Sequence, residues 1–269
     1  MENPRFLIAT DLSDAASKAT DYAIEFGKRF NASLLLLHIF EVANVDANSN
    51  KLMSANFLNR EIKKQIQGTV NDIESKHGLQ ANYMSKEGDL FVLLGEAASE
   101  THSDIMFIGT HGIRGVQHII GSFIAKVING SALPILVVQK ESKPCALKSI
   151  AIWIDHSQQN PIEGWIIAIA KSFQTHIHFV FSEDAVGPGV NAHVDIINQS
   201  MQQHQLPYTV YHINEIADKH THFLNYASSI DASLLVCCRH GHLVNKPIEE
   251  IITNKHHIPV LCLYVDGKA

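Results

Sequence analysis

Short runs of consecutive apolar residues alternate with helical segments along the whole chain. In the first half, runs at 5–10, 33–40, 79–84, 105–109 and 134–139 predict strands. Their consecutive apolar positions are typical of strands covered by helices on both faces. Helices are predicted between them at about 14–30, 51–77 and 89–101. Ser13 or Asp14 should cap the first helix, and Gly78 should end the second in a left-handed conformation. The alternation favours an α/β fold with a parallel sheet.

The second half repeats this order. Strands are predicted at 149–154, 176–181, 208–213, 233–238 and 259–264, with helices at about 161–173, 190–204 and 218–229. The motif Ile8-x-x-Asp11 returns as Ile152-x-x-Asp155, residues 103–112 align with 232–241, and 132–139 align with 257–264. The pattern indicates an internal duplication. It predicts two tandem, doubly wound, five-stranded parallel sheets, in domains 1–142 and 143–269, with a linker at 141–148.

The last strand of each predicted domain is strongly apolar and should lie at a sheet edge, where unpaired backbone groups invite another strand. Because a short linker holds the two edges at high effective concentration, we expect the domains to pair as a pseudo-two-fold unit. A proline at Leu136 or Val138 should then weaken the pairing by removing a backbone donor.

Composition narrows the functional classes. The chain is 46% hydrophobic and 18% charged, with a net charge of -6. Lys and Arg number 13 against 16 Asp and Glu in residues 1–142, and 8 against 11 in the remainder. Neither half is basic, which argues against nucleic-acid and anionic-membrane partners. No apolar run approaches the ~20 residues that span a bilayer. The four cysteines have no CxxC spacing, so a reduced, cytoplasmic setting is expected.

The segment 109–128 carries the clearest chemistry. It follows the fourth strand, contains Gly109, Gly112, Gly115 and Gly121, and enters a helix near Ser122. Glycines permit positive φ and close approach of a ligand, and a helix start favours an anion. The alternative is a flexible glycine loop without a ligand. No Walker or dinucleotide-binding motif is present.

Here the sequence resembles the universal stress protein family, in its tandem, two-domain form. The resemblance lies in TDLSDAASKA after the first strand, LLLLHIFE at the second, and IGTHGIRG…GSFIAKVI followed by PILVVQ. It implies a Rossmann-like fold of the adenine nucleotide alpha hydrolase type. ATP-binding members carry Gly-x2-Gly-x9-Gly-(Ser/Thr), whereas eight residues separate Gly112 from Gly121 here. This shorter spacing changes the loop and bears on phosphate binding.

The resemblance also implies roles for individual residues around ATP or a related adenine nucleotide. Asp11 would hold the adenine or ribose side with Ala9 beside it, and Ile39 would meet the adenine. The remaining implied contacts, from the ribose to the phosphate tail, are Ile108, Gly109, His111, Gly112, Gly121, Ser122 and Phe123. Read without the resemblance, Asp11 is equally an ordinary turn or helix-capping aspartate.

The second domain departs from this pattern, since Cys238 replaces Gly109 in the alignment and no Gly-Ser follows Gly241. We expect it to lack a nucleotide site of this type. It carries twelve of the seventeen histidines, but their spacing matches no zinc motif and no metal is expected. Neighbouring Cys237 and Cys238 should point to opposite faces of a strand.

The function expected is a cytoplasmic stress-response protein that binds an adenine nucleotide and changes its contacts with an unidentified protein partner. A homodimer through other surfaces is compatible with this organisation. The alternatives are a nucleotide-free scaffold and a slow ATPase, for which the sequence offers no catalytic group.

Overall fold

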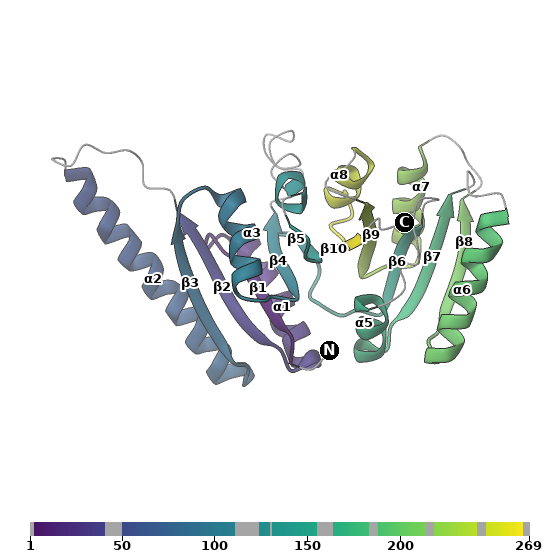
Figure 1. Ribbon diagram of the computed structural model, residues 1–269, viewed down its shortest axis with the longest axis horizontal. Coiled ribbons are helices and arrows are strands. Elements are labelled where there is room, and N and C mark those ends of the chain that lie inside the picture. The colour runs from purple at the N-terminus through teal and green to yellow at the C-terminus, as the bar shows by residue number, and fades with distance from the viewer. Residues whose placement is uncertain are drawn as a thin grey trace.

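The computed structural model describes residues 3–40, 50–110, 124–129, 131–154, 164–182, 188–213, 218–240 and 246–265. These residues form one continuous ten-stranded sheet with helices on both faces (Figure 1). The sequence predicted two five-stranded sheets paired through their last strands, and that pairing joins them into this single sheet.

The first half contributes five strands and the helices that connect them. In chain order they are β1 (Arg5–Ala9), α1 (Asp14–Phe30), β2 (Ser33–Phe40), α2 (Asn50–His77), β3 (Ala81–Glu87), α3 (Leu90–Glu100), β4 (Ile105–Thr110) and β5 (Ile135–Gln139), with a further helix at 124–129. The expected cap of α1 is confirmed, because the Ser13 side chain accepts a hydrogen bond from the Ala16 N–H. Gly78 ends α2 with φ +67°, as predicted.

The second half repeats the arrangement. Its elements are β6 (Ser149–Ile154), α5 (Trp165–Phe173), β7 (His176–Ser182), α6 (Pro188–His204), β8 (Tyr208–Ile213), α7 (Lys219–Ser229), β9 (Leu234–His240), α8 (Lys246–Ile252) and β10 (Val260–Val265). The sequence analysis missed α8, whose seven residues span only two turns. It also placed β3 two residues early. Leu79 is buried beside Gly27 instead of joining the strand.

Strand order explains the two-fold relation. The sheet runs β3-β2-β1-β4-β5-β10-β9-β6-β7-β8. Each half is parallel, and β5 pairs with β10 antiparallel through Leu136 opposite Leu261. The order is the same read outward from this pair in either direction. The expected pseudo-two-fold pairing of the last strands is therefore confirmed.

Leu136 and Val138 are not the residues of β5 whose backbone donors face β10, contrary to the sequence-based expectation. The Lys140 N–H donates to the Thr110 carbonyl, and the Met106 N–H donates to the Pro134 carbonyl, each at 2.9 Å. The backbone N–H and C=O groups of even-numbered residues in β5 therefore point toward β4, because these groups alternate between the two neighbouring strands from one residue to the next. Proline at Leu136 or Val138 would disturb the pairing with β4. Val137 is the residue that faces β10.

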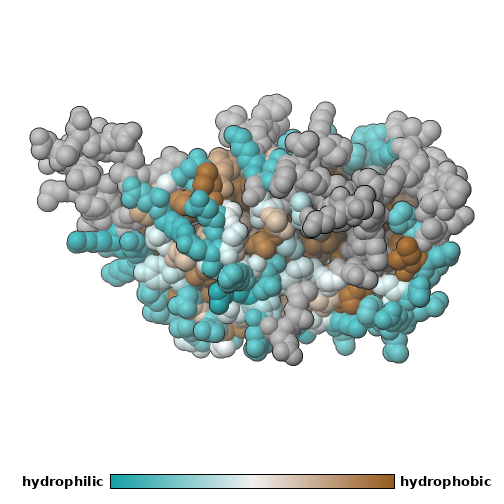
Figure 2. Space-filling view, viewed as in Figure 1, coloured by the Kyte–Doolittle hydropathy of each residue, from teal (hydrophilic) through white to brown (hydrophobic). Residues whose placement is uncertain are grey.

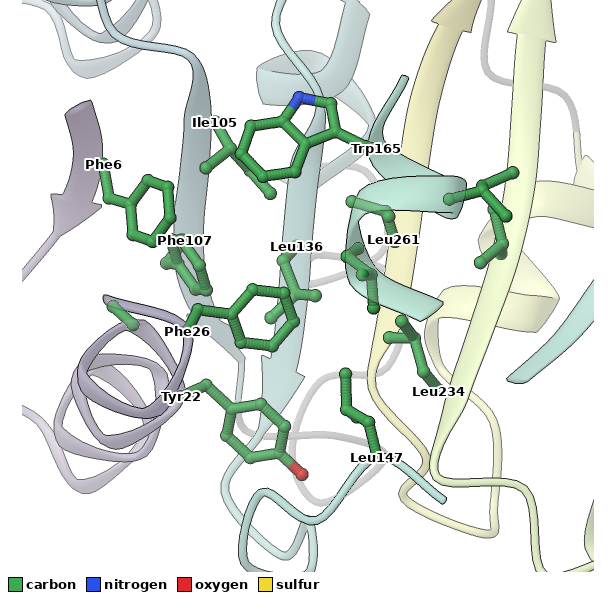
Figure 3. Packing of buried hydrophobic residues seen from close by; sticks show 14 of the residues in the cluster. Phe6, Tyr22, Phe26, Ile105, Phe107, Leu136, Leu147, Trp165, Leu234 and Leu261 are labelled. Carbon is green, nitrogen blue, oxygen red and sulfur yellow. The ribbon is translucent and has the colours of Figure 1, made fainter. Parts of the chain in front are cut away.

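Both faces of the sheet carry an apolar core. On each face the core is continuous across the two halves. Trp165 of α5 lies 6.0 Å from Phe6 and 5.5 Å from Phe30, measured between ring centroids. Figure 3 shows Phe26 and Leu136 of the first half lying beside Leu261 and Leu234 of the second. The halves are thus joined by packing as well as by strand pairing.

A buried polar network closes the same junction. Gln139 is 1% exposed, and its Nε2 donates to the carbonyls of Ile252 and Asn254 at 3.2 and 3.0 Å. Its Oε1 lies 2.9 Å from Nδ1 of His257. The Ser142 hydroxyl donates to the His257 carbonyl at 2.8 Å. The network links the end of β5 to the turn before β10, and leaving any of these groups unpaired would be costly.

The outer surface shows no single large apolar area on the face drawn in Figure 2, where hydrophobic residues form small patches among hydrophilic ones. Among the described residues, no helix combines the length and the apolar character that a membrane crossing needs.

Candidate functional site

The strand order reverses between β1 and β4, which are hydrogen-bonded neighbours with Ala9 opposite Ile108. In open parallel sheets, ligands bind beyond the carboxyl ends of the strands at such a reversal. The sequence analysis placed Asp11 and Gly109 at this crevice on condition that the two strands are adjacent. The structure confirms that condition.

Three of the residues assigned to the nucleotide lie on one face of the sheet. Ala9, Ile39 and Ile108 come from three adjacent strands and belong to the core beneath α3 and the helix at 124–129. Ile108 is buried, whereas Ala9 and Ile39 are partly exposed. They provide an apolar surface at the carboxyl ends of β1, β2 and β4, of the kind that a planar base requires.

Thr110 is a polar residue of this face that the sequence analysis overlooked. It is 3% exposed and ends β4, and its side chain points to the same face as that of Ile108. Its Oγ1 is buried and has no hydrogen-bond partner among the described residues. An unpaired buried hydroxyl is expensive, so this atom offers a hydrogen bond beside the point where the strand order reverses.

Asp11 lies just beyond β1 and is exposed. Its Oδ1 accepts a hydrogen bond from the Ser13 N–H at 2.9 Å, which stabilises the turn into α1. The second oxygen, Oδ2, has no partner among the described residues. The structure therefore supports the local turn role for Asp11 and leaves one carboxylate oxygen for a ligand.

The structure gives a different physical reason for glycine at position 109 from the one that the sequence suggested. It belongs to β4 and is not among the described glycines with positive φ, which corrects the expectation of a left-handed backbone at this position. A Cβ at Gly109 would lie 2.2 Å from the Ala15 carbonyl oxygen and 2.6 Å from the Ala16 nitrogen. The absent side chain admits the first turn of α1, on the face opposite Ala9, Ile39 and Ile108.

The other predicted contacts, His111, Gly112, Gly121, Ser122 and Phe123, lie outside the described residues, and their roles stay predictions.

Comparison with known proteins identifies the family of the chain. The sequence pattern of the universal stress protein family matches residues 2–139, about half of the chain.

The chain belongs to the universal stress protein family.

Two curated relatives carry the same family name. One, from Methanocaldococcus jannaschii, is 26% identical over 143 residues, which cover 52% of this chain and 84% of the relative. YxiE of Bacillus subtilis is 28% identical over 145 residues, 50% of this chain and 98% of the relative. A solved universal stress protein from Archaeoglobus fulgidus aligns with 100% of this chain and 98% of its own, with a TM-score of 0.79 and 13% identity. That similarity shows that the whole ten-stranded fold occurs in another universal stress protein.

The second half of this universal stress protein differs from the first at the position aligned with Gly109. Cys238 stands at the position aligned with Gly109 and is buried in the core on the α5 face. Cys237 lies in the opposite core, as predicted, with its Sγ 3.5 Å from that of Cys262. Residues 241–245 lie outside the described part. The expectation that this half lacks a nucleotide site stays a prediction.

A metal site was weighed for the histidines and cysteines of the second half. Over the described ranges, no group of three or more His, Cys, Asp and Glu residues could hold a metal ion. His242 lies outside those ranges. The expectation of a metal-free second half therefore stays a prediction.

Proposed function

We propose that this universal stress protein binds one adenine nucleotide, ATP or a close relative of it, in the crevice beyond β1 and β4. The observation that carries the proposal is the strand-order reversal between β1 and β4 beside a glycine-rich segment. The base would lie against Ala9, Ile39 and Ile108. The phosphates would extend toward Gly121-Ser122, where the sequence predicts a helix start whose N–H donors and polarity would favour an anion.

In this proposal, nucleotide occupancy in the cytoplasm changes contacts with a protein partner. The physical route begins at Thr110, near the start of the glycine-rich segment. Its carbonyl accepts from the Lys140 N–H, and Thr110 is in register with Gln139. Gln139 in turn bonds to the turn before β10 in the other half. A change in the loop thus has a short, hydrogen-bonded path to the second half.

A nucleotide-free scaffold is the second candidate, and specific observations favour it. Gly109 is accounted for by the packing of α1, and Asp11 by its turn. Neither residue requires a ligand to explain its presence.

Two measurements separate the candidates. Protein purified without added nucleotide is denatured, and the supernatant is examined for adenine compounds by mass spectrometry. Calorimetry with ATP then gives the stoichiometry, expected to be one per chain. The scaffold predicts neither released nucleotide nor binding heat, and two equivalent sites would contradict the assignment to the first half alone.

The double variant Gly121→Val with Ser122→Ala tests the phosphate contacts. Losing the close approach and a charge-assisted hydrogen bond should cost roughly 2–4 kcal/mol, about a 30- to 900-fold weaker Kd. The matched control is Gly68→Val with Thr69→Ala, another adjacent glycine–hydroxyl pair, on α2, where open space surrounds Gly68. An unchanged Kd in the first variant would show that the shorter loop holds the phosphates elsewhere.

A further inference from the structure

A cavity of about 380 Å³ lies where the linker passes the beginnings of β9 and β10. It shares no residue with the proposed nucleotide contacts. Its lining comes from the linker, from α1 through Tyr22, and from the chain just before β9 and β10. The volume is within the range of small-molecule pockets.

The polar lining carries more positive than negative groups. Lys143, Lys148, His256 and His257 line the cavity, with one carboxylate, that of Asp231. That carboxylate already forms an ion pair with Lys143 at 2.7 Å. Among the described residues, Lys148 has no carboxylate within ion-pair distance. Two lysine cations, Lys143 and Lys148, therefore share one carboxylate, since Lys143 first and Lys148 as well lower the pKa of Asp231, and the cavity keeps a net positive charge.

The lining of this cavity also includes a polar atom that has no hydrogen-bond partner among the described residues. Nε2 of His256 is buried and has no partner among the described residues. Burial, assisted by the nearby Lys255 and His257, lowers the pKa of His256 and so favours its neutral form. By contrast, the Tyr22 hydroxyl donates to the Lys143 carbonyl at 2.7 Å, and Figure 3 shows it pointing toward the linker. Lys148 and His256 are therefore the groups that a ligand could satisfy.

The rest of the lining is apolar. Pro144 and Ala146 of the linker face the cavity together with Ala232, Ile258 and Pro259. An inorganic ion would leave this surface in contact with water. A ligand with an anionic group and an apolar body would satisfy both parts of the lining.

The basic lining of the cavity is not repeated by the duplication. In the aligned first half, Ser131 and Ala132 stand where His256 and His257 stand, and Asp104 replaces Ser233. The linker, which supplies Lys143 and Lys148, occurs once in the chain. The basic groups are therefore specific to this place in the molecule, which is the pattern of a site and not of a repeated turn.

We propose that this linker cavity binds a small phosphate monoester, whose dianion contacts Lys148 and His256 and whose organic part lies against Pro144 and Ile258. A ligand there would contact the linker and the second half together, and would stabilise the junction between the halves. This site is separate from the adenine-nucleotide crevice and does not depend on it.

The test titrates the full chain with phenyl phosphate, inorganic phosphate and phenol, using calorimetry and histidine NMR signals. Phenyl phosphate should bind, should do so at least about ten-fold more tightly than inorganic phosphate, and should raise the pKa of His256. No binding of phenyl phosphate, or equally tight binding of phenol, would overturn the proposal.

Variants locate the site. Lys148→Gln should weaken phenyl phosphate binding at least about ten-fold, in line with the loss of a charged hydrogen bond. Lys64→Gln, the same change at an exposed position of α2, should leave it unchanged. The Gly121→Val, Ser122→Ala variant should also bind phenyl phosphate normally. If that variant alone loses binding, the phosphate occupies the nucleotide crevice and the linker site is refuted, whatever the fate of the nucleotide proposal.

Discussion

Among the described glycines, Gly109 is the one where an added methyl group makes the closest contacts, so Gly109→Ala should have the largest effect. The new Cβ would lie 2.2 Å from the Ala15 carbonyl oxygen, 2.3 Å from its carbon and 2.6 Å from the Ala16 nitrogen. These are backbone atoms of the first turn of α1, so no side-chain rotation can relieve the clash. The helix must move away from the sheet by about 1 Å to restore ordinary contact distances.

The cost follows from what α1 buries. Ala19, Tyr22, Ala23 and Phe26 on this helix are each no more than 2% exposed. A gap of 0.5–1 Å forfeits roughly a quarter to a half of the dispersion attraction across it. Overpacked cores typically lose 1–3 kcal/mol. Because the obstacle here is backbone, we expect a loss of about 3 kcal/mol in the free energy of unfolding.

Urea denaturation followed by circular dichroism measures this loss, and Gly68→Ala is the control. Gly68 lies in α2 with nothing within 4 Å of a new Cβ. Alanine there should stabilise the protein by about 0.4–1 kcal/mol through helix propensity and reduced unfolded-state entropy. The same Gly→Ala change is therefore expected to lower the free energy of unfolding at position 109 and to raise it at position 68. If Gly109→Ala lowers stability by less than about 1 kcal/mol while weakening nucleotide binding, the glycine serves the ligand and the packing argument is wrong.

Three further predictions follow from the same structure. Ser13→Ala should cost about 1 kcal/mol of unfolding free energy, since the cap on α1 is lost; an unchanged urea midpoint would contradict it. Residues 1–142 expressed alone should dimerise through β5 by light scattering, and Val137→Pro should reduce the dimer, whereas a monomer at high concentration would refute the pairing argument. Burial raises the pKa of Asp21, so its contribution to stability is present at low pH and is lost as pH rises through the folded pKa. Asp21→Asn should therefore raise the urea midpoint at pH 7 and leave it unchanged at pH 3; equal shifts at both would exclude this cause.

Local signals account for the parts of the fold that the sequence predicted well. The first helix was predicted at 14–30 and occupies Asp14–Phe30, and the strand at 149–154 occupies Ser149–Ile154. Ser13 and Gly78 mark helix ends because a hydroxyl cap and a left-handed residue act within a single turn. The duplication was also readable, since residues 103–112 and 232–241 share a pattern of apolar positions.

The candidate site was predictable only in outline. The approximate position of the crevice followed from parallel strands and a glycine-rich segment, because ligands collect at strand ends in such sheets. Thr110 was missed because an unpaired hydroxyl is invisible in a sequence. Gly109 was identified for the wrong reason, because the sequence does not reveal that α1 approaches β4 closely enough to exclude a Cβ.

The sequence by itself determined most of the elements, their repetition, the family and the pairing of the last strands, since these depend on short-range periodicity, caps and motifs. Tertiary structure decided which contacts join the two halves. The packing of Trp165 against Phe6, the direction of Val137 toward β10, and the Gln139 network all connect residues far apart in the chain. Such contacts depend on the orientation of whole elements, which no local pattern specifies. The linker cavity arises for the same reason, because its basic groups come together only after the last strands have paired.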